Sequence, residues 1–156
     1  MSPTIMPSSR LDPMGLALEE ARAAAGRGEV PVGAVILHEG ELIACAGNRT
    51  LEMKDPTAHA EMLVVRAACA HLGSERLTAC DIYVTLEPCA MCATAMSFAR
   101  LRRLYFAASD PKMGGVEHGA RIFAQSTCHH RPEIYGGIRE GEAATLLRSF
   151  FSSRRC

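Results

Sequence analysis

The amino-acid sequence predicts a three-layer α/β/α fold around a five-stranded mixed sheet, and two observations support this prediction. Apolar segments with the pattern of β-strands alternate along the chain with segments whose apolar residues recur at helical intervals. The first two strand segments follow each other across a short polar turn, which indicates an antiparallel hairpin. An opening hairpin followed by alternating helices and strands favours a mixed sheet with helices on both faces.

Several segments have the apolar periodicity of helices. The first begins at Asp12, a residue type that caps helices, followed by Pro13, and it ends near Gly26. Gly73 is placed to close the second helix. The later helices are expected at 59–72, 89–99 and 140–155, with a short one at 120–125.

Five segments have the pattern of strands. The continuous β-branched run at 32–37 predicts a strand that is buried on both faces. The other strands are expected at 42–46, 82–86, 103–108 and 133–135. Between them, the polar stretches 47–57 and 109–118 are expected to form loops that are long enough to carry function.

Composition indicates one globular domain. The chain has 156 residues, 48% of them hydrophobic and 22% charged, and its formal net charge is zero. We expect a single domain over 11–156 after a disordered, Pro- and Ser-containing leader at 1–10. A membrane helix of roughly 18 apolar residues and a secretory signal are both missing from the sequence, so a cytoplasmic protein is expected.

The seven cysteines do not suggest a disulfide framework, because their number is odd and they are scattered. Cys45, Cys69 and Cys80 lie in apolar runs and are expected to be buried. Only Cys89 and Cys92 have the spacing of metal ligands.

One histidine, two cysteines and one glutamate together suggest a hydrolytic zinc site. Cys89 and Cys92 share a face at the start of a predicted helix, where the helix N-terminus stabilises thiolates. With His59 at the start of another helix, these ligands leave one position of a tetrahedral zinc for water, and Glu61 could move protons to and from that water. Residues two apart point in nearly opposite directions on a helix, so this arrangement requires His59 to lie at the helix end.

These motifs also occur in other kinds of site. A Cys-x-x-Cys pair alone also occurs in redox sites and in structural zinc sites. A structural site needs a fourth ligand, which the Cys-His-His segment at 128–130 could supply, but it leaves Glu61 without a role. Pro88 directly before Cys89, and the position of both motifs at helix starts, favour catalytic zinc.

The motifs also resemble a known family. His-Ala-Glu at 59–61 followed by Pro-Cys-x-x-Cys at 88–92 is similar to the zinc-dependent cytidine deaminase superfamily. Further blocks, in the same order from about residue 16 onward, resemble its bacterial tRNA-specific adenosine deaminases. These blocks are 29–35, 47–49, 55–61, 85–89, 109–112 and 146–155.

The resemblance implies a fold, an activity and partners. The expected fold is cytidine-deaminase-like, with one Zn²⁺ per subunit and a likeness to proteins that work as homodimers. The expected substrate is the anticodon stem-loop of a tRNA, in which the first anticodon (wobble) adenosine is converted to inosine. The chain departs from the family pattern at His129, among other positions. This residue lies within the loop from Ser126 to His130, where a changed specificity would be expected.

Roles for individual residues follow from the same resemblance. It makes His59, Cys89 and Cys92 the zinc ligands, and it gives Glu61 the transfer of a proton from the attacking water to the purine N1 and the departing ammonia. The implied substrate contacts are Asn48 with the base or ribose, Val32, Ala60 and Pro88 lining the base pocket, and Asp110 with a neighbouring sugar. From the residues alone, Val32 is also a core strand residue, and Asn48 and Asp110 also suit turns.

Because the net charge is zero, phosphate contacts must come from local arginine clusters. The candidates are Arg100, Arg102 and Arg103 in one cluster, and Arg148, Arg154 and Arg155 in the other.

The sequence is also compatible with two other functions. The first is a small-molecule purine base or nucleoside deaminase (guanine, guanosine or adenosine type) on the same fold, which would prefer a free purine to a stem-loop. The second is a non-catalytic, zinc-stabilised binding module, which would have a fourth protein ligand and release no ammonia.

Overall fold

The computed structural model describes residues 11–154, so the expected leader at 1–10 and Arg155 lie outside the described part. Every predicted element is present, with ends that differ by about two residues at most. The short helix is a turn of 3-10 helix. The elements are α1 (Pro13–Gly26), β1 (Gly33–His38), β2 (Glu41–Gly47), α2 (Ala60–Leu72), β3 (Cys80–Leu86), α3 (Ala90–Ala99), β4 (Arg103–Ala108), η2 (Ile122–Ala124), β5 (Glu133–Tyr135) and α4 (Glu140–Ser153).

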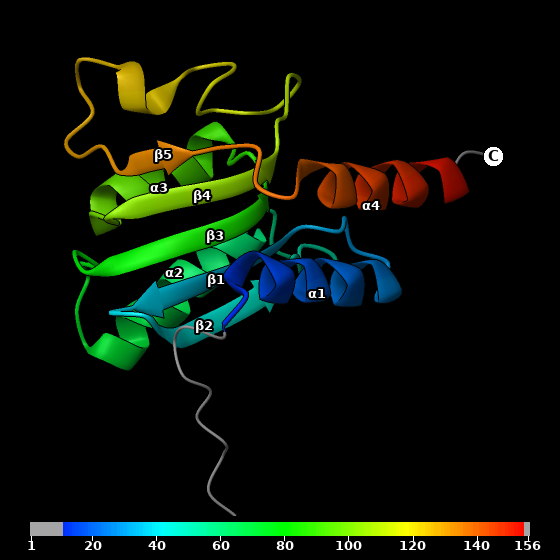
Figure 1. Cartoon of the computed structure of the whole chain (residues 1–156), viewed down its shortest axis with the longest axis horizontal. Coiled ribbons are helices and arrows are strands. Elements are labelled where there is room, and N and C mark those ends of the chain that lie inside the picture. The colour runs from blue at the N-terminus through cyan, green and yellow to red at the C-terminus, as the bar shows by residue number, and fades with distance from the viewer. Residues whose placement is uncertain (1–10, 155–156) are drawn as a thin grey trace, which may run out of the picture.

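The five strands form one mixed sheet in the order β2-β1-β3-β4-β5 (Figure 1). Strand β1 is antiparallel to both β2 and β3, which confirms the predicted hairpin. Strands β3, β4 and β5 are parallel to one another. Because parallel strands end at the same edge of a sheet, the segments that follow β3 and β4 lie close together there.

Helices cover both faces of the sheet, as predicted. Helices α2 and α3 lie on one face, and α1 and α4 lie toward the other (Figure 1). Each face has its own hydrophobic core, and alternate residues of β1 point into each of them, Ile36 into the first and Val35 into the second. Among residues 11–154, no helix is long and apolar enough to span a bilayer.

Helix ends follow the predicted chemistry. The side chain of Asp12 accepts a hydrogen bond from the backbone N–H of Gly15 at 3.0 Å and caps α1. Gly73 closes α2 in the left-handed conformation, with φ of +64°, which a glycine adopts without steric cost.

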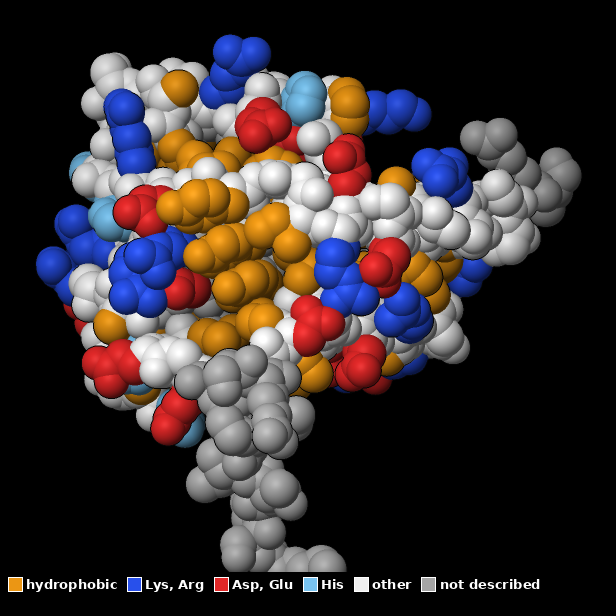
Figure 2. Space-filling model, viewed as in Figure 1, with side chains coloured by type: hydrophobic (Ala, Val, Ile, Leu, Met, Phe, Trp, Pro, Cys, Tyr) orange, Lys and Arg blue, Asp and Glu red, His pale blue; other side chains and the backbone are white. Residues whose placement is uncertain are grey.

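One face of the sheet carries a row of aromatic side chains. Tyr83, Tyr105 and Tyr135 stand in register on β3, β4 and β5, with ring centroids 4.3 and 5.0 Å apart. Tyr83 and Tyr105 pack against the core beneath α1, and Figure 2 shows hydrophobic side chains gathered on this face of the molecule. The stack contributes to the register of three parallel strands.

The prediction that three cysteines are buried was partly wrong. Cys80 is buried and Cys69 is half-buried, but Cys45 is exposed. Successive residues of a strand point to opposite faces, and β2 is an edge strand, so Ala44 faces the core while Cys45 faces outward.

Candidate active site

The N-termini of α2 and α3 meet at the site. His59 and Cys89 are the residues directly before these helices, and both have an extended backbone with φ of −71°. Neither side chain caps its own helix, so both are free to bind a ligand. Since His59 lies outside the helix and Glu61 lies in its first turn, the requirement set by their two-residue spacing is met.

The three expected ligands come together. Nδ1 of His59 lies 3.6 Å from Sγ of Cys89 and 3.5 Å from Sγ of Cys92. In a tetrahedral zinc site with ordinary bond lengths, such nitrogen and sulfur atoms stand roughly 3.6 Å apart. The side chains therefore fit a zinc ion, and within residues 11–154 they are the only group of three His, Cys, Asp or Glu residues placed this way.

The segment at 128–130 does not supply a fourth ligand. The thiol of Cys128 donates to the carbonyl of His130, and Nε2 of His130 lies 2.6 Å from the carbonyl oxygen of Leu101. The ring of His129 packs near Phe98. A three-ligand group with an open position is the arrangement of catalytic zinc.

The two thiols differ in acidity because one donates to the other. A hydrogen bond from Cys92 lowers the pKa of Cys89 to about 4, and His59 adds to this effect. The same hydrogen bond, together with burial, raises the pKa of Cys92. A thiolate is therefore stabilised at the start of α3, where metal binding needs it.

Glu61 is the buried carboxyl group of the site, with only 4% of its surface exposed. Burial is the main cause that raises its pKa to about 7, and the charge of Cys89 acts in the same direction. A group that titrates near neutral pH can both accept and return a proton, which is what acid–base catalysis requires.

The buried side chain of Glu29 holds the loop at 48–57, here called the Glu29 loop. The carboxylate of Glu29 is buried and accepts hydrogen bonds from three groups of this loop, the hydroxyl of Thr50 and the N–H groups of Leu51 and Glu52. Burial alone would raise the pKa of Glu29, but these donors hold it below its ordinary value. At the start of the loop, Oδ1 of Asn48 accepts from the N–H of Ala60 at 2.8 Å and so fixes the first residue of α2.

The loop at 109–119, here called the Glu87 loop, is fixed in a similar way. Its backbone donates to the carboxylate of Glu87, the residue directly before Pro88, which is only 2% exposed. Burial would raise the pKa of Glu87, but the N–H of Asp110 and the side chain of His118 hold it below its ordinary value. The sequence alone assigns no role to Glu29, Glu87 or His118, and Glu29 and Glu87 stand out only as charged residues next to apolar strand segments.

The expected base-pocket residues are buried. Val32 and Ala60 belong to the same core cluster as Cys92, and Pro88 is buried directly before Cys89. Asn48 is also nearly buried. Asp110 lies on the Glu87 loop, where its side chain accepts from the N–H groups of Lys112 and Met113. The side chain of Asn48 therefore fixes the start of α2, and that of Asp110 shapes a turn.

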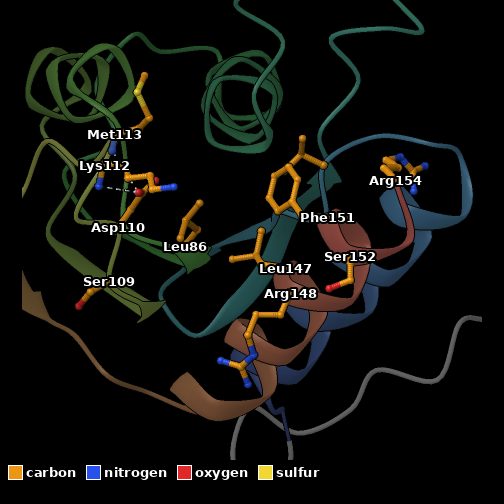
Figure 3. A pocket seen from close by; sticks show the side chains of 11 residues that line it. Leu86, Ser109, Asp110, Lys112, Met113, Leu147, Arg148, Phe151, Ser152 and Arg154 are labelled. Carbon is orange, nitrogen blue, oxygen red and sulfur yellow. Dashed lines mark hydrogen bonds between the residues drawn. The ribbon is translucent and has the colours of Figure 1, made fainter. Parts of the chain in front are cut away.

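A groove of about 900 Å³ lies beside the site, between the Glu87 loop and the last turns of α4 (Figure 3). Leu86 lies in it, three residues before Cys89. Its apolar surface comes partly from Met113 and Phe151 on opposite sides. Its charged side chains are Asp110, Lys112, Arg148 and Arg154, which gives it an excess of positive charge.

The two arginine clusters differ in their surroundings. Arg102 is paired with Asp81 at 2.8 Å, and Arg103 with Glu133 at 2.7 Å, at the end of β3 that lies away from Leu86. Arg148 and Arg154 line the groove instead. Phosphate binding is thus better supported by the second cluster than by the first.

Comparison with known proteins agrees with this geometry. Residues 8–108 match the family described as the cytidine and deoxycytidylate deaminase zinc-binding region. The chain is 59% identical over 142 residues to the tRNA-specific adenosine deaminase of Agrobacterium fabrum, covering 91% of this chain and 93% of that protein. The corresponding protein of Aquifex aeolicus is 46% identical over 140 residues, with 90% and 92% covered.

Solved structures are similar as well. One comes from a study of A-to-I editing by tRNA:A34 deaminases at the wobble position of transfer RNA, with a TM-score of 0.86, 59% identity, and 86% of this chain and 98% of that chain covered. The guanine deaminase of Nitrosomonas europaea aligns with a TM-score of 0.76 at 25% identity, covering 94% and 85%. With its three ligands at two helix starts and its matching family region, the chain belongs to the cytidine and deoxycytidylate deaminase family of zinc-binding proteins.

Proposed function

We propose that the chain is a zinc-dependent hydrolase that deaminates adenosine to inosine at the first anticodon position of tRNA. The observation that carries the chemistry is the group of His59, Cys89 and Cys92 with the buried Glu61 beside it. The substrate is supported by relatives up to 59% identical that are named tRNA-specific adenosine deaminases.

The residues of the site divide the reaction between them. When bound by His59, Cys89 and Cys92, zinc supplies Lewis-acid activation of the attacking water. Glu61 takes a proton from this water as its oxygen adds to C6 of the purine. The same carboxyl group passes this proton to N1. It then carries the second proton of the added water from the C6 hydroxyl to the amine as the C6–N bond breaks, so one water is consumed and one ammonia is released.

The pocket would hold the reactive base, and the groove would hold the neighbouring nucleotides. We assign the adenine base to the surface formed by Val32, Ala60 and Pro88, which are buried and keep bulk water away. The amide nitrogen of Asn48 is free to donate to the base or ribose, because only its Oδ1 is used by Ala60. The neighbouring sugar would meet Asp110.

The positive groove matches the phosphates of an anticodon loop. Arg148 lies in α4, Arg154 directly follows that helix, and Lys112 comes from the facing loop, so cationic groups line both sides. Splayed bases of single-stranded RNA stack on aromatic side chains, and Phe151 is exposed in the groove for such a contact.

We further propose that the protein acts as a homodimer in the cytoplasm, where its tRNA substrate is found. Phe98 on α3 is 65% exposed and lies beside a cavity of about 230 Å³ that Ile122 and Cys128 also line. Exposed apolar surface of this kind is typical of a protein interface. Light scattering of the native chain and of Phe98→Asp tests this, since a dimer that uses α3 becomes a monomer.

Inosine mapping tests the function itself. The zinc-loaded chain is incubated with a tRNA that carries adenosine at the first anticodon position, and inosine is read as guanosine after reverse transcription. We expect conversion at that position alone. Faster conversion of free adenosine, guanine or cytidine than of the stem-loop would refute the tRNA assignment, and no ammonia from any substrate would support a binding module.

A further inference from the structure

A single buried carboxylate holds the Glu87 loop (residues 109–119) in place. Oε2 of Glu87 accepts from the N–H groups of Val116, Glu117 and His118 at 3.0 to 3.2 Å. Oε1 accepts from the N–H of Asp110 at 3.1 Å and lies 2.8 Å from Nδ1 of His118. Both oxygens are therefore used, and all their donors belong to one loop.

This arrangement needs a carboxylate in particular. Each oxygen accepts from at least one backbone N–H group, and an amide at the same position would turn its own NH₂ donor toward one of these groups. A donor facing a donor in a buried place leaves both without partners, which is costly. The carboxylate of Glu87 thus binds the backbone near both ends of the loop.

The loop also lies against the segment that carries the metal ligands. The N–H of Gly115 donates to the carbonyl of Pro88 at 2.8 Å. A Cβ atom on Gly115 would lie 2.5 Å from the backbone nitrogen of Ala90, and one on Gly114 would lie 2.6 Å from Cδ of Glu87. These glycines allow the backbone to approach Cys89 and its neighbours more closely than any other residue could.

The other half of the loop forms one side of the groove. Asp110 is bound through its N–H to Glu87, and its own side chain fixes Lys112 and Met113. All three residues line the groove opposite α4 (Figure 3). The position of this side of the groove relative to the metal ligands therefore depends on Glu87.

We propose that Glu87 is a positioning residue for substrate binding, which sets the distance between the groove and the metal ligands without touching the substrate. This inference rests on the proposed RNA substrate, because the groove is assigned to the nucleotides beside the reactive adenosine. Loss of the carboxylate would displace Asp110 and Lys112 and leave the four residues of the reaction centre in place.

The test combines kinetics with hydrogen exchange in the zinc-loaded enzyme. In Glu87→Gln we expect a full zinc content and a kcat close to that of the native chain, but a rise of about tenfold or more in KM for the stem-loop. The amides of residues 110 and 116–118 should exchange at least about tenfold faster. His118→Ala, which removes one contact of a partly exposed side chain, should shift KM in the same direction by less.

Asp81→Asn is the matched control. It removes a carboxylate from the other end of β3, where Arg102 is its partner, and should leave kcat, KM and the exchange of 116–118 unchanged. An unchanged KM or unchanged amide exchange in Glu87→Gln overturns the proposal, as does a fall in zinc content or in kcat alone. If the native chain forms no inosine in the stem-loop, the proposed function fails, and the exchange data still show whether Glu87 holds the loop.

Discussion

Two loops border the site, and each is held by a buried glutamate, but they are attached to different parts of it. The carboxylate of Glu29 holds the Glu29 loop near its middle, by accepting hydrogen bonds from residues 50–52. The first residue of this loop, Asn48, caps α2 beside His59. Glu87 holds its loop at residue 110 and at residues 116–118, and the first half of that loop lines the groove. The first loop therefore supports the reaction centre, and the second supports the surface that receives the rest of the substrate.

Because the two loops support different parts of the site, this fold can change its substrate without changing its chemistry. Changes in the Glu29 loop reach the metal ligand His59 along the chain itself and through the hydrogen bond from Ala60 to Asn48. A further hydrogen bond, from the N–H of Arg49 to the carbonyl of Ala58, joins the loop to the residue before His59. Changes at the exposed residues Lys112 and Met113 of the Glu87 loop reach only the groove. We expect the two loops to affect different properties of the enzyme.

The largest effect is expected at Glu61, which belongs to neither loop. Glu61→Gln removes the group that accepts and returns the proton, so kcat should fall by about 10²- to 10⁴-fold. Zinc content and KM should change little, because the ligands and the groove are intact. Single-turnover inosine formation and metal analysis check this, and a kcat near the native value would remove Glu61 from the mechanism.

Glu29→Gln should have the next largest effect, on stability. Because the folded-state pKa of Glu29 lies below its ordinary value of 4.5, its contribution is present above that pH and is lost as the pH falls through the folded pKa. The variant should lose about 1.5–3 kcal/mol of unfolding free energy at pH 7. Its stability should also depend less on pH in acid than that of the native chain.

Urea unfolding between pH 3 and pH 7 measures both parts of this prediction. The acid dependence of Glu29→Gln keeps the contributions of the other carboxylates, so only the slope should be reduced. Equal slopes in the two proteins would mean that the Glu29 loop is not held by a charged group, and the comparison with Glu87 would lose its basis.

Asn48 offers a sharper separation of fold from chemistry. Asn48→Ala leaves the N–H of Ala60 without its acceptor and should cost about 1 kcal/mol of stability as well as turnover. Asn48→Asp keeps the acceptor but loses the amide donor, so it should retain stability and still lose turnover. If Asn48→Asp is fully active, Asn48 serves the helix alone and does not contact the substrate.

The smallest effect is expected in the groove. Arg148→Ala removes one cation that has no acidic partner among the described residues, so RNA binding should weaken a few-fold. The slope of log K against log salt should fall by about 0.7 to 1 for one lost phosphate contact. Arg102→Ala, whose partner is Asp81, is the control and should leave the slope unchanged.

The sequence was most informative where the signal is local. His59, Cys89, Cys92 and Glu61 could be found because ligand type, spacing and helix starts all lie within a few residues. The strands and helices were predictable for the same reason, since their apolar periods are short.

Contacts between distant segments left no such signal. Glu29 and Glu87 bind loop residues that are 21 to 31 positions away, and no period or motif connects them. Cys45 was misjudged because a continuous apolar run does not reveal whether its strand lies at the edge of the sheet. The base and sugar contacts of Asn48 and Asp110 remain predictions.

The tight approach of Gly114 and Gly115 has a consequence for laboratory evolution. Any side chain at these two positions would collide with Glu87 or Ala90, so a library that varies them should yield mostly inactive clones. Met113, by contrast, is 71% exposed and one residue away. Selection for a new sequence preference should therefore accumulate substitutions at 112 and 113 and stop abruptly at 114.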